Sequence, residues 1–351
     1  MTRTKQTRAI EPKNGPWKLA DLDSIPKHGH TVFSCFHCGG GSSMGYKLAG
    51  FDVLGGVEID PEMMGLYKQN HHPAHSFLMG VKEFNQIPND KIPKELFGID
   101  ILDGSPPCSL FSMAGEREKK WGVLKKFREG QAEQILDDLF FDFIETAKKL
   151  QPKVVVAENV KGLVSGNARG YVKEILTKLN AAGYDTQIFL LNSCRMGCPQ
   201  KRERVFFVGR HKGLSLPEIK LKFDEPVISV KQAWADLKNQ QGNALKGETI
   251  RLWQMAKPGQ SMAKVKKRGK GFNNLKVAWD GPAATVATAG RLYHPKECRM
   301  LSNMEVIRLQ TFPDDYDFGK SAVRYVCGMS VPPYMMQRIA LELFFQWFGA
   351  M

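Results

Sequence analysis

The sequence predicts an α/β protein built on a largely parallel sheet with helices on both faces. Short apolar segments alternate along the chain with longer stretches in which apolar residues recur at helical spacing. This alternation is typical of parallel sheets, because each crossover between parallel strands is usually made by a helix. A chain of 351 residues is long enough for one large domain or for two.

The expected strands are short apolar runs that begin after residue 30. They are Thr31–Phe36, Val53–Ile59, Ile99–Asp103, Lys153–Ala157, Gln187–Leu191 and Arg204–Val208. The expected helices are Ser42–Ala49, Gln131–Leu150, Gly170–Ala182, Ser302–Gln310 and Pro333–Phe348.

Three domain-level segments follow from where this alternation begins and ends. Residues 31–210 carry it and form the main domain, which residues 320–351 complete. Residues 211–319 are rich in Lys, Gly, Gln and Asn without clear periodicity, which indicates a smaller, irregular domain. Residues 1–30 are basic and aperiodic, so we expect a flexible arm; its start resembles a core-histone tail, for which chance is the simplest explanation.

The charge of the chain indicates a polyanionic partner. Lys and Arg number 50 against 36 Asp and Glu, a formal net charge of +14, so nucleic acid is the first expectation and an anionic membrane the second. No apolar run reaches the ~18 residues needed to span a bilayer. The seven cysteines, an odd number, favour reduced thiols in a cytosol-like compartment.

A glycine-rich loop follows the first expected strand and opens a helix. Gly39, Gly40 and Gly41 would let the backbone approach a ligand closely, and the helix N-terminus favours negative groups. Glu58, near the end of the second strand, stands where an acid commonly accepts hydrogen bonds from ribose hydroxyls. The alternative is a simple tight turn before a helix.

Pro106-Pro107-Cys108 follows a third strand, at the sheet edge where α/β proteins bind ligands. The prolines restrict the backbone before a thiol that could act as a nucleophile. The alternative is that Cys108 is a small buried hydrophobe. The polar stretch 112–131 that follows resembles a mobile lid.

Two further polar elements are expected at the same edge. Glu158 follows four apolar residues, so partial desolvation would suit it to proton donation; the alternative is a strand-end acid that caps a helix. In Gln200-x-Arg202-x-Arg204, strand alternation would direct the three side chains to one face. Two guanidinium groups there could hold a phosphate or a base oxygen, or could belong to a solvated edge strand.

Together, and in this order, these elements resemble the cytosine-5 DNA methyltransferase family of prokaryotic or phage type. The match covers about residues 31–210 and 280–345, and includes Arg299–Pro313 and Gly328-Met-Ser-Val-Pro. The ordered set is more specific than any one element. The resemblance implies a Rossmann-like S-adenosylmethionine-dependent methyltransferase fold, with a target-recognition domain over 211–319.

The resemblance implies methyl transfer to carbon 5 of cytosine within a specific double-stranded DNA sequence. Cys108 would add to carbon 6 of a flipped cytosine, because carbon 5 is a poor nucleophile until carbon 6 is covalently occupied. Glu158 would hydrogen-bond ring nitrogen 3 and the exocyclic amine. Arg204 would contact the carbonyl oxygen of the base, and Arg202 would support the site.

The resemblance also implies that S-adenosylmethionine is the cofactor and which residues contact it. They are Phe36, Gly39, Gly41, Glu58, Ile59, Pro107, Leu139, Ser330 and Val331. Three positions depart from the family: Cys38 replaces a usual glycine, Val81 an Asp that contacts the adenine amine, and Met329 an Asn near the methionine end. A modified cofactor is the alternative that these departures leave open.

DNA contacts are expected mainly from basic side chains. The expected residues are Gln200, Lys264, Lys266, Lys267, Arg268, Lys270 and Arg291. A basic run is usually a solvated surface, but the net charge favours phosphate contacts. The expected partner is double-stranded DNA, with no membrane and a monomeric enzyme beside a possible cognate restriction endonuclease. The expected location is the cytoplasm of a prokaryotic or phage-infected cell, or the nucleus if the host is eukaryotic.

Three other interpretations stay open. Zinc ligands could come from Cys35, Cys38, Cys194 and Cys198 or from His71, His72 and His75, but we expect no metal, since structural zinc needs four convergent ligands. The substrate could be a transfer RNA, although the Cys-Phe-Thr stretch of that branch is absent. The chain could also be a non-catalytic DNA-binding paralogue, against which the intact Cys108 and Glu158 argue.

Overall fold

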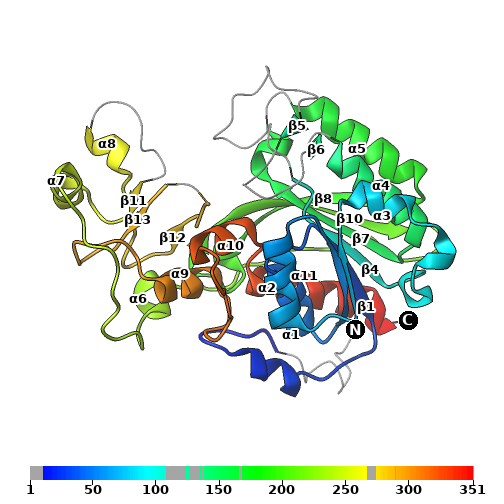
Figure 1. Ribbon diagram of the computed structural model, residues 1–351, viewed down its shortest axis with the longest axis horizontal. Coiled ribbons are helices and arrows are strands. Elements are labelled where there is room, and N and C mark those ends of the chain that lie inside the picture. The colour runs from blue at the N-terminus through cyan, green and yellow to red at the C-terminus, as the bar shows by residue number, and fades with distance from the viewer. Residues whose placement is uncertain are drawn as a thin grey trace.

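The computed structural model describes residues 11–107, 138–165, 168–266, 274–288 and 290–350, together with the backbone of 124–125 and 134–135. Within these ranges the chain forms two lobes (Figure 1). The large lobe surrounds a central sheet. The small lobe is made mainly of residues 230–300 and carries short helices and strands.

The large lobe is built on a seven-stranded sheet of order β3-β2-β1-β4-β7-β10-β8. The strands are β1 Thr31–Cys35, β2 Asp52–Glu58, β3 His75–Leu78, β4 Ile101–Gly104, β7 Val154–Val160, β8 Tyr184–Asn192 and β10 Glu203–His211. The first five in spatial order are parallel, while β10 is antiparallel to β7 and β8. The carboxyl ends of the parallel strands therefore meet at one edge. All six predicted strands are present, and the four-residue β3 was not predicted.

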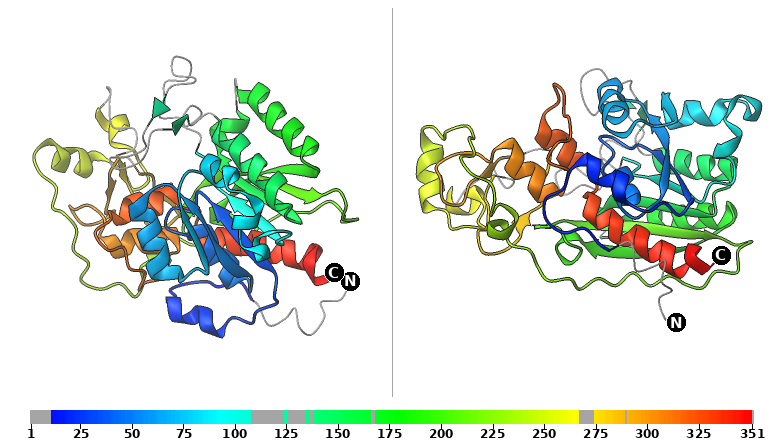
Figure 2. Two further views of the ribbon diagram at one scale, coloured as in Figure 1. Left: turned by 45° about the vertical axis from the view of Figure 1, so that its right-hand side comes forward. Right: turned by 90° about the horizontal axis from the view of Figure 1, so that it is seen from below.

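Helices cover both faces of the sheet, as predicted (Figures 1 and 2). One face carries α3 Val81–Gln86, α4 Leu139–Leu150 and α5 Arg169–Ala181, and the other carries α1 Gly41–Leu48, α2 Pro61–His71 and α11 Pro333–Gln346. Each face has its own cluster of buried apolar side chains. The central strands β1, β4 and β7 are buried almost throughout, as expected of a sheet with helices on both faces.

The helix predicted over Gln131–Leu150 is shorter than expected. Gln134–Ile135 forms strand β6, antiparallel to β5 Leu124–Lys125, and α4 begins only at Leu139. Asp138 precedes the first helical residue, where a carboxylate interacts favourably with the helix dipole. The helical periodicity thus belongs to the second half of the predicted stretch. The rest of the predicted lid at 112–131, apart from Leu124–Lys125, lies outside the described residues.

The small lobe has little regular structure, as its composition predicts. Its elements are α6 Val230–Ala233, α7 Glu248–Met255, α8 Met262–Lys266, β11 Leu275–Lys276, β12 Ala283–Ala284 and β13 Leu292–Tyr293. β9 Gln200–Lys201, α9 Asn303–Gln310 and α10 Val323–Met329 lie where the lobes meet. The predicted boundary at residue 211 is too early. Ile219 hydrogen-bonds Gln187 of β8, and Trp347 donates to the Pro217 carbonyl, so these residues pack on the large lobe.

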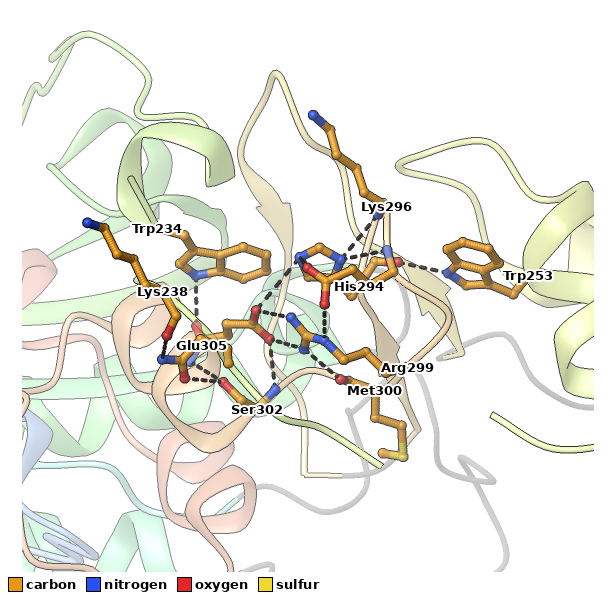
Figure 3. A network of polar contacts seen from close by, with 11 residues as sticks. Trp234, Lys238, Trp253, His294, Lys296, Arg299, Met300, Ser302 and Glu305 are labelled. Atoms are coloured by element: carbon orange, nitrogen blue, oxygen red, sulfur yellow. Dashed lines mark hydrogen bonds and ion pairs between the residues drawn. The ribbon is translucent and has the colours of Figure 1, made fainter. Parts of the chain in front are cut away.

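A buried polar network holds the small lobe together (Figure 3). Arg299 donates to both carboxylate oxygens of Glu305, at 2.8 and 2.7 Å. His294 stacks on Trp234 and accepts backbone hydrogen bonds at Nδ1 from Lys296 and Glu297, which leaves its Nε2 proton towards Glu305. Burial lowers the pKa of His294, so the ring is neutral near pH 7. The network orders the loop that carries Lys296.

The predicted flexible arm is wrong for residues 11–30. Trp17 is buried and donates from Nε1 to the Thr311 carbonyl at 2.9 Å. The Arg338 guanidinium of α11 bonds the Lys13 carbonyl and the Asn14 side chain, and a short helix, η2 Leu19–Ser24, follows. We call residues 11–25 the N-terminal strap. One aromatic anchor and backbone hydrogen bonds fix it, and neither produces a periodic pattern in the sequence. Residues 1–10 lie outside the described residues.

We expect Trp17→Ala to lower the free energy of unfolding by about 3–5 kcal/mol, because it removes a fully buried indole and leaves a cavity. Urea unfolding followed by circular dichroism measures this change. The exposed neighbour Lys18→Ala is the control and should change stability little. A loss below about 1 kcal/mol for Trp17→Ala would show that the strap does not anchor the fold.

Candidate functional site

The glycine-rich loop leaves β1 in an unusual backbone conformation. Phe36, Cys38 and Gly40 all have positive φ, at 57°, 48° and 76°. This left-handed region costs little for glycine but about 1–2 kcal/mol for residues with a Cβ. The fold therefore holds Phe36 and Cys38 in place against a local preference.

The same loop packs against the segment after α10. A Cβ added to Gly41 would lie 2.2 Å from the Val331 carbonyl oxygen, and one on Gly39 would lie 2.4 Å from Val326. The Tyr316 hydroxyl donates to the Gly39 carbonyl at 2.8 Å. Only glycine fits at these two positions. The structure thus brings the predicted cofactor residues of the loop together with Ser330 and Val331.

Glu58 is fixed at the end of β2 by backbone donors. Its two carboxylate oxygens accept from the N–H groups of Cys38 at 2.9 Å and Asp60 at 3.0 Å. Burial raises the pKa of Glu58, and these donors act against the rise. The acid therefore stays oriented beside the glycine-rich loop and retains acceptor capacity. Ile59 follows it and is half-buried.

The Pro-Pro-Cys loop begins at the same edge. The Asn159 amide, at the end of β7, donates to the Pro106 carbonyl at 3.1 Å, and the Ser105 N–H donates to Cys35 at the end of β1. Pro107 is half-buried. Cys108 itself lies outside the described residues. The backbone two residues before Cys108 is positioned by the hydrogen bond from Asn159, which is adjacent to Glu158.

Glu158 and Arg204 form an ion pair on adjacent strands. Arg204 Nε lies 2.8 Å from Glu158 Oε1, and both side chains are mostly buried. Burial lowers the pKa of Arg204, while Glu158 opposes the change. Both residues expected to contact one base are therefore side by side. They are paired with each other in this structure, so a base would have to share or replace that contact.

Arg202 joins three segments of the chain. It is 2% exposed, and its Nη atoms donate to the carbonyl oxygens of Val286 at 3.0 Å and Gly328 at 2.9 Å. Burial, with Arg204 as the next cause, lowers its pKa to about 9. These two hydrogen bonds fix the positions of the three segments relative to one another, and the supporting role of Arg202 at the site stays a prediction.

The structure contradicts the DNA contact that was predicted for Gln200. Its side chain is fully buried, donates to Leu309 and Gln310, and accepts from the Val286 N–H. A residue without exposed surface is unsuited to contact DNA, so we no longer assign Gln200 that role. The side chains of Gln200 and Arg202 both bond the backbone of Val286, so it is the burial of Gln200 that excludes the predicted contact and not its direction along the strand.

Two buried polar residues close to the site were not singled out by the sequence reasoning. Gln310 donates to the Ser330 carbonyl at 2.7 Å and so links the motif around Gln200 to the glycine-rich loop. Asp103 is buried in β4 and accepts from Ser34 at 2.8 Å and Tyr46 at 3.3 Å. An acid within an apolar strand was the available signal for Asp103. Burial raises its pKa to about 7.

The remaining predicted residues lie in several places. Leu139 is the buried first residue of α4, Val81 is buried at the start of α3, and Met329 ends α10 half-buried. Lys264, Lys266 and Arg291 are exposed on the small lobe, with Lys266 paired to Glu248. Lys267, Arg268 and Lys270 lie outside the described residues.

The part of the chain that the structure describes has no group of three or more His, Cys, Asp or Glu side chains placed to hold a metal ion. No helix in these ranges is both long and apolar enough to cross a membrane.

Comparison with known proteins decides the family. A model for the C-5 cytosine-specific DNA methylase family matches residues 30–344. The chain belongs to this family. The Type II methyltransferase M1.HphI of Haemophilus parahaemolyticus is 28% identical over 335 residues, which are 88% of this chain and 85% of the relative. M.FnuDI of Fusobacterium nucleatum is 27% identical and covers 89% of this chain and 93% of its own.

Solved structures agree with the fold of this methylase. A prophage-encoded Escherichia coli protein described as a DNA modification methyltransferase superposes with TM-score 0.67 at 23% identity, over 91% of this chain and 99% of its own. A DNMT2 mutant from Spodoptera frugiperda gives 0.63 at 17%, over 90% and 100%. The predicted methyltransferase fold is confirmed. The family match and its Type II relatives likewise confirm the predicted DNA (cytosine-5) methyltransferase.

We expect Asp103 of this methylase to make stability depend on pH. Folded Asp103 keeps its proton up to about pH 7, whereas the unfolded chain releases it near 3.8, so its contribution is present below about pH 4 and lost as the pH rises through 7. Asp103→Asn removes this titration. The wild-type free energy of unfolding, minus that of the variant, should fall by up to a few kcal/mol from pH 4 to 8.

Urea unfolding at pH 5, 6, 7 and 8 measures the difference. The exposed Asp90→Asn is the matched control, and its difference from wild type should stay nearly constant. A constant difference for Asp103→Asn as well would contradict a protonated, buried Asp103.

Proposed function

We propose that this enzyme methylates cytosine within a duplex DNA sequence through a covalent intermediate formed by Cys108. The observation that carries the proposal is the convergence of two sets of residues at one edge of the sheet. Glu58 is hydrogen-bonded to the glycine-rich loop, and Asn159 joins the Pro-Pro-Cys loop to the strand that carries Glu158. A cofactor and a base held there would be adjacent.

The residues around the glycine-rich loop fit S-adenosylmethionine. The loop follows the first strand, and Glu58 offers a fixed carboxylate for ribose hydroxyls. Phe36, Ile59, Pro107, Leu139, Ser330 and Val331 are proposed to complete the site with Gly39 and Gly41. When bound, the cofactor supplies an electrophilic methyl group. A modified cofactor is the alternative suggested by the departures at Cys38, Val81 and Met329, and the mass added to cytosine in the product DNA distinguishes the two.

The protein residues carry the rest of the chemistry. We assign the nucleophile to Cys108, whose thiolate would add to carbon 6 of the flipped cytosine. Glu158 would hold ring nitrogen 3 and the exocyclic amine, and Arg204 the carbonyl oxygen, as their mutual contact opens. After carbon 5 is methylated, loss of its proton re-forms the double bond and expels the Cys108 thiolate.

DNA recognition is assigned to the small lobe. Lys264 and Arg291 are exposed, and the net charge of +14 favours phosphate contacts. The curated relatives are named Type II methyltransferases. We therefore propose double-stranded DNA as the substrate, a monomeric enzyme beside a separate cognate endonuclease, and action in the host cytoplasm.

Incubation with duplex DNA containing 5-fluorocytosine and S-adenosylmethionine should trap a covalent complex that resists denaturing electrophoresis, because fluorine cannot leave as the proton does. Cys108→Ala should abolish the complex. Cys298→Ser, which changes an exposed cysteine of the small lobe, is the control and should keep it. Mass analysis of unmodified DNA should show a 14-dalton increase on cytosine. Trapping on transfer RNA instead would contradict a DNA substrate.

The affinity for DNA should fall steeply with salt. Replacing both Lys264 and Arg291 with Gln should reduce the slope of log K against log salt by roughly 2, because each phosphate that a cation neutralises adds about 0.9 to the slope. Lys173→Gln, an exposed change on α5 of the large lobe, should leave the slope unchanged. Fluorescence anisotropy between about 50 and 200 mM salt measures it. An unchanged slope in the double variant would remove these residues from the interface.

A further inference from the structure

The peptide group between Gly39 and Gly40 has more conformational freedom of its own than the rest of the glycine-rich loop. Glycine lacks a Cβ, so both residues that flank this peptide tolerate either sign of φ. Both are buried, and Gly40 has a φ of 76°. A peptide between two glycines can rotate at little local cost. Its orientation therefore depends on the hydrogen bonds that its N–H and carbonyl groups make.

Two hydrogen bonds, one at each polar atom, hold this peptide. The Gly40 N–H donates to the His37 carbonyl at 2.8 Å, within the loop itself. The Gly39 carbonyl accepts from the Tyr316 hydroxyl at 2.8 Å, although Tyr316 lies 277 residues further along the chain. The contact from Tyr316 thus ties the loop to the segment between α9 and α10.

Burial keeps Tyr316 in the state that this contact needs. The side chain is 4% exposed, and its ring centroid lies 5.2 Å from that of Phe312 and 4.6 Å from that of Phe318. Burial raises the pKa of the Tyr316 phenol well above its usual value. The hydroxyl therefore keeps its proton and remains a donor to the Gly39 carbonyl.

The backbone on either side of Tyr316 is held by two other elements. Asn70, on α2, bonds both backbone polar groups of Asp317: its oxygen accepts from the N–H and its amide donates to the carbonyl, each at 2.8 Å. The Asp314 N–H donates to the carbonyl of Trp17, in the N-terminal strap, at 2.8 Å. The hydroxyl is therefore presented to the loop from a fixed position, which lowers the entropy cost of the contact.

We propose that Tyr316 is a positioning residue for the cofactor: its hydroxyl holds the Gly39–Gly40 peptide, and with it the glycine-rich loop, in the conformation that binds S-adenosylmethionine. Without the hydroxyl, the buried Gly39 carbonyl loses its partner and the loop populates other conformations. The apparent dissociation constant of a ligand that binds one conformation rises as the fraction of chains in that conformation falls. This inference rests on the proposed cofactor role of the loop.

Isothermal titration of full-length Tyr316→Phe with S-adenosylhomocysteine tests this role. The dissociation constant should rise about three- to tenfold over that of wild type, as expected when one hydrogen bond of ordinary strength is lost. Tyr184→Phe is the matched control. It also removes a buried hydroxyl from a carbonyl, that of Pro152 at 2.9 Å, but before β7 at the opposite edge of the sheet. Its affinity should equal that of wild type, although both variants should unfold at lower urea concentrations.

Steady-state kinetics separate positioning from a general loss of structure. In Tyr316→Phe the KM for S-adenosylmethionine should rise by about three- to tenfold. The value of kcat at saturating cofactor should stay within about twofold of wild type, because the bound cofactor restores the loop conformation. A lower kcat with an unchanged KM would overturn the proposal.

Equal affinities of wild type and Tyr316→Phe for S-adenosylhomocysteine would also overturn it, as would an equal loss of affinity in Tyr184→Phe. If Tyr316→Phe does not fold by circular dichroism, Asn70→Ala, which releases Asp317 beside Tyr316, takes its place with the same expectation. Failure of the folded wild-type chain to bind S-adenosylhomocysteine would instead contradict the proposed cofactor site.

Discussion

The buried guanidinium of Arg202 is the contact on which the arrangement of the site depends. It bonds the carbonyl oxygens of Val286 and Gly328, which lie 84 and 126 residues further along the chain. A buried charge is tolerated only when such hydrogen bonds are made, so the geometry of all three segments is coupled. The strand that carries Arg204, the small lobe and the segment before Ser330 therefore keep fixed relative positions.

The glycine-rich loop adds a steric constraint to this polar one. Gly39 and Gly41 lie so close to Val326 and Val331 that any side chain would force the segments apart. Gln310 stabilises the same contact by donating a hydrogen bond to the Ser330 carbonyl. The part of the site proposed for the cofactor is thus shaped by backbone proximity, and the part proposed for the base by charged side chains.

Much of the fold could be predicted because it depends on local patterns. Apolar strands such as Val154–Val160 are buried on both faces, and their composition alone indicates them. The predicted DNA contact of Gln200 was wrong because Leu309 and Gln310, distant in sequence, bury its side chain, which strand alternation cannot reveal. Trp17 and Gln310 were not predicted as anchors, since their partners are backbone carbonyls distant in sequence. Long-range contacts of this kind leave no periodic trace.

The fastening of the N-terminal strap has a consequence for biosynthesis. Trp17 leaves the ribosome long before Thr311, the residue whose carbonyl it bonds, is made. At typical elongation rates the delay is roughly 15 to 60 seconds. During that interval the indole lacks its native packing partner and stays available to chaperones. Docking of this segment therefore becomes one of the last events of maturation.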